Sequence, residues 1–317
     1  MRILITGGFG YLGGRLARFL EQSGNHTIIL GTRGSKVKPE WLPNSEIVKM
    51  DWDSRDSLNQ ICKGVDVIIH LAGMNASECA VDPVMALEFN GVATARIIQA
   101  AVSQKVKRFI YFSTAHVYDS PLAGDINENT LPKSLHPYAT SHRAAEDVVM
   151  AAHSRKEITG IVFRMSNAFG APVNIDAKCW MLLVNDLCKQ VVKTQKMLLN
   201  SSGTQLRDFL TITDVCRATL HMIYCDLDIS YLPLFNLGGG CSLSVMEMAQ
   251  LISQIYISEF GKEVKLICQD PKNNESSYNL IYNIDLLKRM GFHPQNEFRE
   301  EISQLLAFCN KNFNIND

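Results

Sequence analysis

Three glycines near the start of the chain have the spacing that can hold a pyrophosphate. Gly7 and Gly10 lie between the apolar segment 2–6 and a segment with helical spacing, 11–23, and Gly13 lies in the first turn of that segment. Glycine allows a tight turn and a close approach of the backbone to phosphate, and the first N–H groups of a helix favour negative charge. The pattern predicts a dinucleotide-binding turn, and the alternative is a glycine turn in a flavodoxin-like fold. The expected cofactor-binding residues of this turn are Gly7, Gly10, Tyr11, Leu12 and Gly13.

The residues after the second apolar run, 27–31, bear on which dinucleotide binds. An Asp or Glu there would hold a ribose 2′-hydroxyl, but residues 30–36 contain no acid and carry Arg33. A guanidinium suits a 2′-phosphate, so the sequence favours NADP over NAD. The alternative is that Arg33 stacks on the adenine or faces solvent. Asp51 and Trp52 end the third run and are expected beside the adenine amino group.

Tyr138 and His142 are candidates for moving a proton. They are four residues apart, about one helical turn, so they share one face of a helix. A tyrosine, with an ordinary pKa near 10, serves as a base only where a nearby cation lowers that value. A histidine, with an ordinary pKa near 6.5, is mostly neutral at pH 7 and donates one hydrogen bond. Arg143 does not share this face, because the next residue points about 100° round the helix.

Strand-like and helix-like segments alternate over the first part of the chain. Between the strands lie segments with helical spacing, among them 11–23 and 84–104. This alternation predicts an α/β fold, a Rossmann doubly wound parallel sheet with helices on both faces. The expected strands are 2–6, 27–31, 46–50, 65–71, 108–114 and 159–164.

After about residue 170 the pattern loosens into a small mixed region. We expect residues 1–170 to form an NAD(P)-binding Rossmann domain. Residues 171–317 are expected to be mainly substrate-binding, with some strands and helices returning to the Rossmann core. The helices expected there are 178–195, 213–226 and 244–260, and the strands are 196–199, 208–212 and 264–268.

Composition excludes several classes of partner. The 317 residues have a formal net charge of −1, which gives no electrostatic reason to expect nucleic acid or a membrane as partner. A strand that begins at residue 2 leaves no room for a signal peptide, and no apolar run has the length of a membrane span. Nine scattered cysteines without a Cys-x-x-Cys pair predict reduced thiols, no metal site and a cytoplasmic protein.

Several motifs, in order along the chain, resemble the extended short-chain dehydrogenase/reductases of the NAD-dependent epimerase/dehydratase family. The resemblance covers nearly the whole chain, and the order of the motifs makes it specific. The motifs that carry it are the glycine turn, His70-Leu71-Ala72-Gly73, Asn90, Phe112-Ser113-Thr114-Ala115-His116-Val117-Tyr118, Pro137-Tyr138-Ala139-Thr140-Ser141, Arg164-Met165-Ser166-Asn167, Gln205-Leu206-Arg207-Asp208-Phe209 and Asn236-Leu237-Gly238.

The resemblance implies roles for individual residues. Tyr138 would be the catalytic acid/base, and Thr114 would hydrogen-bond the same substrate oxygen. The nicotinamide would carry out the redox step while the protein supplies position and a proton. The remaining residues are expected beside the cofactor (Leu71, Ala72, Gly73, Asn90, Tyr138, His142) or the substrate (Asn75, His116, Asn167, Arg207).

His142 departs from the resembled pattern, which has a lysine four residues after the tyrosine. Three interpretations stay open. His142 does the work of the lysine with weaker activation, or the reaction needs less help, as in the reduction of an activated ketone. The third interpretation is a catalytically weakened protein that binds a dinucleotide as a regulator or scaffold.

The resemblance also implies a substrate class and an assembly. Arg207 would contact the diphosphate of a nucleotide-activated hexose, which suggests polysaccharide precursors as a setting. Dehydratases carry acids where this chain has Ala115 and His116, so reduction of a 4-keto sugar or epimerisation is favoured over dehydration. Arg33, which favours NADP as the cofactor, favours reduction over epimerisation. The helices near 83–104 and 138–155 have apolar residues on more than one face and predict a homodimer.

Overall fold

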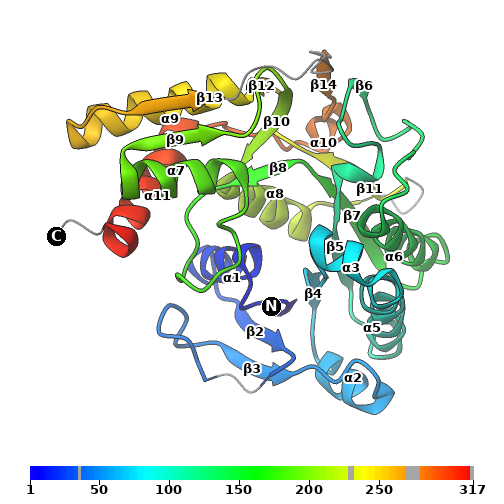
Figure 1. Cartoon of the computed structure of the whole chain (residues 1–317). Coiled ribbons are helices and arrows are strands. Elements are labelled where there is room, and N and C mark those ends of the chain that lie inside the picture. Colours follow the sequence, from blue (N-terminus) through cyan, green and yellow to red (C-terminus); the bar gives the residue numbers. More distant parts are fainter. Residues whose placement is uncertain (35–36, 228–231, 269–278, 315–317) are drawn as a thin grey trace.

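A seven-stranded parallel sheet forms the centre of the protein in the computed structural model (Figure 1). The structure describes residues 1–34, 37–227, 232–268 and 279–314. Within this sheet, the strands other than the edge strand at residues 46–49 are apolar runs buried on both faces, so their hydrophobicity is continuous rather than alternating. In order across the sheet, the strands are β11 (Leu234–Leu237), β7 (Thr159–Met165), β5 (Arg108–Thr114), β4 (Val67–His70), β1 (Arg2–Thr6), β2 (Thr27–Thr32) and β3 (Glu46–Lys49).

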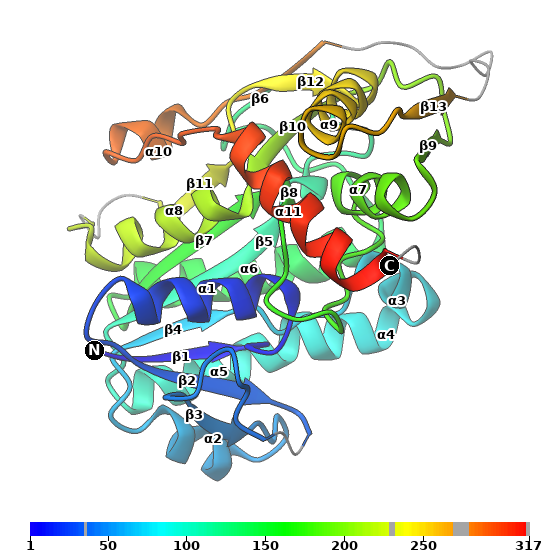
Figure 2. The same ribbon diagram turned by 90° about the vertical axis from the view of Figure 1, so that its left-hand side faces the viewer.

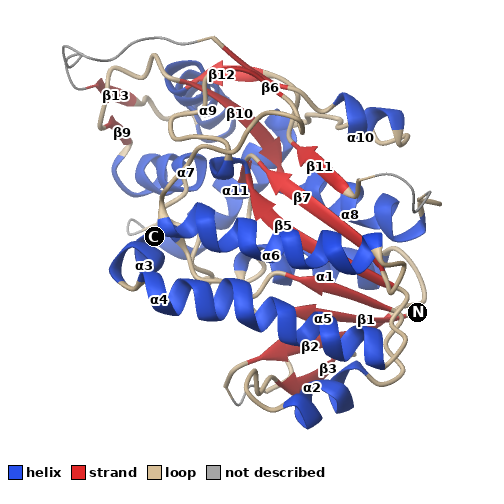
Figure 3. Cartoon of the chain, turned by 90° about the vertical axis from the view of Figure 1, so that its right-hand side faces the viewer, coloured by secondary structure: helices blue, strands red, loops and turns tan. Residues whose placement is uncertain are grey.

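Helices cover both faces of this sheet. Helices α1 (Tyr11–Gln22) and α8 (Ile212–Tyr224) pack on one face (Figure 2). Helices α2 (Arg55–Cys62), α5 (Ala93–Ser103) and α6 (Pro137–Ser154) pack on the other (Figure 3). The doubly wound Rossmann fold predicted from the sequence is therefore confirmed, and the carboxyl ends of the strands meet at one edge, where ligands of such sheets bind.

A second group of elements lies beyond that edge. Strands β8 (Asn167–Phe169), β10 (Leu206–Thr211) and β12 (Ser242–Ser244) form a small sheet, and β9 (Lys196–Leu199) pairs with β13 (Lys265–Cys268). Their apolar core is shared by three helices. These helices are α7 (Leu183–Thr194), α9 (Val245–Phe260) and α11 (Phe298–Phe313).

Short elements complete the described chain. Strand β6 (Gly124–Ile126) pairs with β14 (Leu280–Tyr282). Among the described helices, none is long and apolar enough to cross a membrane. The remaining elements are α3 (Ala76–Val81), α4 (Pro83–Ala86), the π-helical turn η1 (Leu87–Val92), the 3-10 turn η2 (Ala115–Val117) and α10 (Asp285–Arg289).

The predicted elements agree with the structure except in a few places. The helix expected over 84–104 is interrupted by the π-helical turn, and the helix expected from residue 178 begins at Leu183, because residues 178–182 form turns. Strand β11 was not predicted, since a four-residue run followed by three glycines is a weak strand signal. Helix α11 was also missed, although Ile302, Leu305 and Cys309 have helical spacing and are buried.

Candidate active site

The turn between β1 and α1 has the geometry of a phosphate cradle. Gly10 is the N-cap of α1 and offers no side-chain cap, so the first N–H groups of the helix are left for an anion. A Cβ at Gly13 would lie 2.3 Å from the carbonyl oxygen of Gly7, and Gly7 has a φ of 69°. Glycine is therefore required at both positions, and the backbone of this turn fits the pyrophosphate of a dinucleotide.

The first turns of α1 are hydrogen-bonded to the segment that directly follows β8. Tyr11 and Leu12, which the sequence predicts to bind the cofactor, directly follow the N-cap. The Tyr11 hydroxyl donates to the carbonyl oxygen of Gly170 at 2.9 Å, and Arg15 donates to that of Ala171 at 3.0 Å. These bonds fix the helix N-terminus relative to the elements that follow β8.

A second loop, after β4, lies against the glycine turn. The Thr6 hydroxyl oxygen accepts hydrogen bonds from the N–H groups of Leu71 and Ala72 at 3.1 and 3.2 Å. A Cβ at Gly7 would lie 3.0 Å from the nitrogen of Ala72, so the two loops touch. The predicted cofactor residues Leu71, Ala72 and Gly73 thus border the phosphate cradle, which is where a dinucleotide would pass.

His70 holds these loops together and is neutral. Its Nδ1 and Nε2 lie 2.7 and 2.9 Å from the hydroxyls of Thr6 and Thr94. The Thr94 hydroxyl donates to the carbonyl oxygen of Asn90 at 2.6 Å, so it must accept from Nε2–H, and Thr6 must donate to Nδ1. Burial, with the neighbouring His142, lowers the pKa of His70 to about 3. The ring is therefore fixed in its Nε2–H form.

Asn90, a predicted cofactor residue, uses its side chain within the protein. Its Oδ1 accepts from the N–H of Met74 at 2.8 Å, and its Nδ2 donates to the Ser141 hydroxyl at 3.0 Å. The amide thus joins the loop after β4 to helix α6. Asn75, predicted to bind substrate, is the N-cap of α3, and its side-chain oxygen accepts from the N–H of Glu78.

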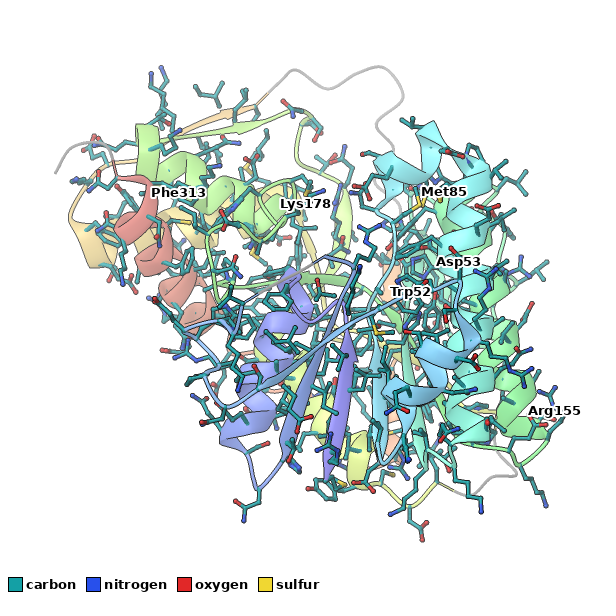
Figure 4. All side chains as sticks on the ribbon, turned by 90° about the horizontal axis from the view of Figure 1, so that it is seen from below. Trp52, Asp53, Met85, Arg155, Lys178 and Phe313 are labelled. Atoms are coloured by element: carbon teal, nitrogen blue, oxygen red, sulfur yellow. The ribbon has the colours of Figure 1, made fainter. Side chains whose placement is uncertain are left out.

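The expected adenine end of the site is an aromatic cluster. The Arg33 guanidinium stacks on the Phe89 ring at 4.9 Å, and the Trp52 ring lies edge-on to Phe89 at 5.8 Å. Figure 4 shows Trp52 where the blue strands meet the cyan helices. Asp51, at the end of β3, is exposed. Arg33 is also exposed and has a planar partner, while residues 35–36 of the same loop lie outside the described residues.

Thr114, Tyr138 and His142 come together where β5 ends and α6 begins. The Thr114 side chain caps the turn η2 by accepting from the N–H of His116 at 3.1 Å. The Tyr138 and His142 rings are in edge-to-face contact, with centroids 4.5 Å apart. Burial raises the pKa of Tyr138, and hydrogen bonding with Thr114 only partly opposes this. The phenol therefore carries its proton at neutral pH.

His142 is a buried, uncharged neighbour of this tyrosine. The Tyr111 hydroxyl lies 2.6 Å from His142 Nδ1, and burial lowers the pKa of His142 from 6.5 to about 4. A neutral imidazole supplies no positive charge to stabilise a Tyr138 phenolate. The pair therefore consists of a protonated phenol and an uncharged imidazole.

A buried ion pair anchors helix α6 beneath these residues. Arg164 on β7 and Glu146 on α6 form hydrogen bonds as short as 2.6 Å, and their side chains are 5% and 1% exposed. Burial acts to lower the pKa of Arg164, but the bonds to Glu146 raise it above its ordinary value. The Ser113 hydroxyl donates to the same carboxylate at 2.5 Å. The pair fixes α6 against the sheet and so fixes the face that carries Tyr138.

The predicted substrate residues His116, Asn167 and Arg207 line one cavity of about 610 Å³. The Asn167 amide donates to the backbone oxygen of Asp208 at 2.9 Å. Burial lowers the pKa of His116, and so does the charge of Arg207, which places these two side chains close together. A cavity with one guanidinium and several amide and hydroxyl groups can bind a diphosphate and a sugar.

Comparison with known proteins decides the family. The sequence profile described as "NAD dependent epimerase/dehydratase family" matches residues 3–228. The chain belongs to this family. Human dTDP-D-glucose 4,6-dehydratase is 26% identical over 333 residues, covering 98% of this chain and 91% of that protein. UDP-glucose 4-epimerase 3 of Oryza sativa subsp. japonica is 25% identical over 283 residues, covering 80% and 75%.

The fold of the family is also found in solved structures. UDP-glucose 4-epimerase from Thermotoga maritima, determined with UDP-glucose, superposes with a TM-score of 0.81. The two chains are 20% identical, and the match covers 98% of this chain and 99% of the other. At this identity the likeness establishes the fold, and the reaction of this family member must be argued from its own residues.

Two side chains of this epimerase/dehydratase family member were not singled out from the sequence. Tyr111 is the hydrogen-bond partner of His142, and its signal was its place in β5, two residues before Ser113, so that both face α6. Asp208 follows Arg207 on β10 and is fully buried. It accepts from the Ser166 hydroxyl at 2.5 Å, and burial raises its pKa to about 7.

No cluster of three or more metal-ligating side chains occurs within the described ranges. The described cysteines are free thiols, and those on the central elements are buried.

Proposed function

We propose that the protein reduces the keto group of a 4-keto hexose attached to a nucleoside diphosphate, with NADPH as reductant. The observation that carries this proposal is the pair formed by Tyr138 and an uncharged His142, with ring centroids 4.5 Å apart. Reduction of a ketone requires a proton donor at its oxygen, whereas oxidation of an alcohol requires a base. Tyr138 has a raised pKa, so it keeps its proton and serves as the donor.

In the proposed reaction, each residue of the site would have a separate role. A nicotinamide dinucleotide held by the glycine turn would supply the hydride. Thr114 and Tyr138 would hold the carbonyl oxygen between their hydroxyls, and Tyr138 would transfer its proton to that oxygen. His142 would contribute a hydrogen bond rather than a charge. After this transfer the Tyr138 phenolate would regain a proton from solvent. Because Tyr138 starts protonated, the site begins with the acid that ketone reduction needs, whereas an epimerisation that begins with alcohol oxidation would need a base.

Cofactor preference follows from the loop after β2. Residues 30–34 contain no carboxylate, and Arg33 is exposed beside the aromatic cluster of Trp52 and Phe89. A carboxylate would repel a 2′-phosphate, whereas a guanidinium can bind it in a bidentate manner. These features support NADP over NAD.

The substrate assignment rests on the 610 Å³ cavity. Arg207 would bind the diphosphate, and Asn167 and His116 would face the sugar or its phosphate. The positions that follow Thr114 are Ala115 and His116, which supply no carboxyl group for the elimination of water. This composition supports reduction over dehydration. The cytoplasmic supply of polysaccharide precursors is the setting that such a product fits.

A homodimer is part of the proposal. Val84, Leu87 and Val92, on α4 and η1, are 67%, 48% and 45% exposed, and this surface runs alongside α6. Exposed apolar side chains on adjacent helices suit a second copy of the same chain. Light scattering on the eluting protein at micromolar concentration should give about twice the mass of one chain, and a monomer would refute this part.

The reaction is tested in two steps. The nucleotide released by acid from fresh protein is first identified by mass spectrometry. NADPH and NADH oxidation is then measured with UDP- and dTDP-linked 4-keto sugars, with Tyr138→Phe as control. We expect NADPH-dependent reduction that is lost in Tyr138→Phe. Tightly retained NAD with interconversion of two sugars would establish an epimerase instead, and binding without turnover would favour the regulator or scaffold.

A further inference from the structure

The hydroxyl of Tyr111 has one described hydrogen-bond partner, and that partner is His142. The Tyr111 side chain is 2% exposed and His142 is 7% exposed. The oxygen of Tyr111 lies 2.6 Å from His142 Nδ1. Burial keeps the pKa of the Tyr111 phenol well above its ordinary value, so this hydroxyl retains its proton.

This single contact determines which nitrogen of His142 carries the proton. If Nδ1 were protonated, it would donate to Tyr111, and the phenol proton would have no acceptor in the described part of the chain. A buried donor without an acceptor is costly. The phenol therefore donates to Nδ1, and the neutral imidazole carries its proton on Nε2.

The other nitrogen of His142 is left for a ligand. No described residue accepts a hydrogen bond from Nε2, and this atom is not among the buried polar atoms that lack a partner. Nε2 therefore retains some solvent exposure, and it belongs to a ring that also contacts the ring of Tyr138.

We propose that Tyr111 is a positioning residue that fixes His142 in the Nε2–H form, so that an uncharged imidazole presents a hydrogen-bond donor to the bound nicotinamide dinucleotide. The proposal rests on the proposed function, because it takes the ligand beside Tyr138 to be this cofactor.

The neighbouring aromatic rings restrict the orientation of the Tyr111 side chain. His70 and Tyr111 are register partners on β4 and β5, and their rings stack with centroids 5.8 Å apart. The rings of Tyr111 and His142 are also 5.8 Å apart. Because His70 is itself fixed by Thr6 and Thr94, the phenol of Tyr111 is held on one side and has little freedom to turn away from His142.

The first test observes the tautomer directly and needs no activity. Protein labelled with ¹⁵N in its histidine rings is studied without ligand by long-range proton–nitrogen NMR, and the signals of His142 are identified by their loss in His142→Gln. We expect a protonated Nε2 and a hydrogen-bonded, unprotonated Nδ1. In Tyr111→Phe the Nδ1 signal should move toward the value of a mixture of tautomers.

A matched control separates this effect from a general loss of packing. Tyr118 is also a buried tyrosine with a hydrogen-bonded hydroxyl, which donates to Asn236 at 2.7 Å. Tyr118→Phe should leave the His142 signals unchanged. A wild-type protein with a protonated Nδ1, or a Tyr111→Phe variant with unchanged signals, would overturn the assignment.

The second test measures the dissociation constants of NADPH and NADH. Tyr111→Phe should weaken binding by about 3- to 10-fold, the effect of one imperfectly oriented hydrogen bond. In a His142→Gln background the same substitution should have no further effect. An equal loss in both backgrounds would show that Tyr111 acts only through the fold and would overturn the proposal.

These outcomes also distinguish a failure of the role proposed for Tyr111 from a failure of the proposed keto-sugar reduction. If NADPH binds as expected but no keto sugar is reduced, the proposed reaction fails and the role of Tyr111 stands. If the NMR spectrum shows the Nε2–H form but neither nucleotide binds, both the proposed function and the cofactor contact of His142 are refuted.

Discussion

Replacing His142 by lysine should restore a positive charge beside Tyr138. Burial lowers the pKa of His142 from 6.5 to about 4. A lysine whose pKa fell by a similar amount from its ordinary value of about 10.4 would have a pKa of about 8 and remain mostly charged at pH 7. The ring centroids of His142 and Tyr138 are 4.5 Å apart, so the new charge would lie near the phenol.

The size of the effect follows from that separation. A unit charge at about 5 Å, with an effective dielectric constant of about 20, stabilises a phenolate by about 3 kcal/mol. This lowers the pKa of Tyr138 by about 2 and gives up to about 100-fold more phenolate at neutral pH. His142→Lys should therefore raise kcat/KM for alcohol oxidation at pH 7, and kcat/KM for ketone reduction should rise by a comparable factor because both directions pass through the same transition state.

The assay is kcat/KM against pH in both directions. The rise of the oxidation rate with pH, which reports ionisation of the free enzyme, should occur about 2 pH units lower in His142→Lys than in the wild type. The uncharged variant His142→Gln should show no such displacement. If His142→Lys is folded and binds dinucleotide but its oxidation profile coincides with that of the wild type, the electrostatic reasoning is wrong.

Three further substitutions test the scaffold. Gly13→Ala should abolish dinucleotide binding in a calorimetric titration, since its Cβ would lie 2.3 Å from the Gly7 oxygen. Glu146→Gln should lower the free energy of unfolding in urea by about 3 kcal/mol, because Arg164 would be left buried and unpaired. Burial raises the pKa of Asp208 from 3.8 to about 7, so the folded state binds more protons than the unfolded state between these pH values. The contribution of Asp208 to the free energy of unfolding is therefore full below pH 3.8 and is lost as pH rises through 7. In the wild type the free energy of unfolding should fall by about 4 kcal/mol over this range, and Asp208→Asn should remove that fall.

Matched variants keep these predictions falsifiable. Gly91→Ala places a Cβ at an ordinary contact distance of 3.5 Å from Ala144 and should retain dinucleotide binding. Glu157→Gln breaks an exposed pair with Arg155 and should leave the unfolding midpoint unchanged. Equal effects within either matched pair, or an unchanged pH dependence of stability in Asp208→Asn, would contradict the explanation given for that residue.

The fold was readable from the sequence because parallel strands leave a strong pattern. Runs such as 2–6 and 108–114 are apolar on both faces, and the glycine turn follows the first of them at once. The interruption of the helix expected over 84–104 was not readable. Leu87–Val92 form a π-helical turn where Gly91 packs against α6, and that contact depends on a segment about 50 residues away.

The site was readable only in part, for a similar reason. Helical spacing placed Tyr138 and His142 on one face, and the structure shows their rings in contact. The partner of His142 could not be found that way, because Tyr111 lies 31 residues earlier on a strand, and their contact is set by the packing of α6 on β5. The raised pKa of Asp208 likewise arises from burial beneath elements distant in sequence, and one residue's chemistry does not reveal it.

The charges of four residues give a physical reason for the proposed direction of the reaction. Arg33 lies beside the aromatic cluster, and Arg207 lines the 610 Å³ cavity. His70 and His142 are buried, and their pKa values are lowered to about 3 and about 4. Both are therefore uncharged at neutral pH. In the proposed reaction the two guanidinium groups would attract anionic phosphates, and the uncharged imidazoles would leave the proton of Tyr138 in place. Such an arrangement would bind the charge that a dinucleotide and a nucleotide sugar carry, and would keep a neutral acid for the carbonyl oxygen.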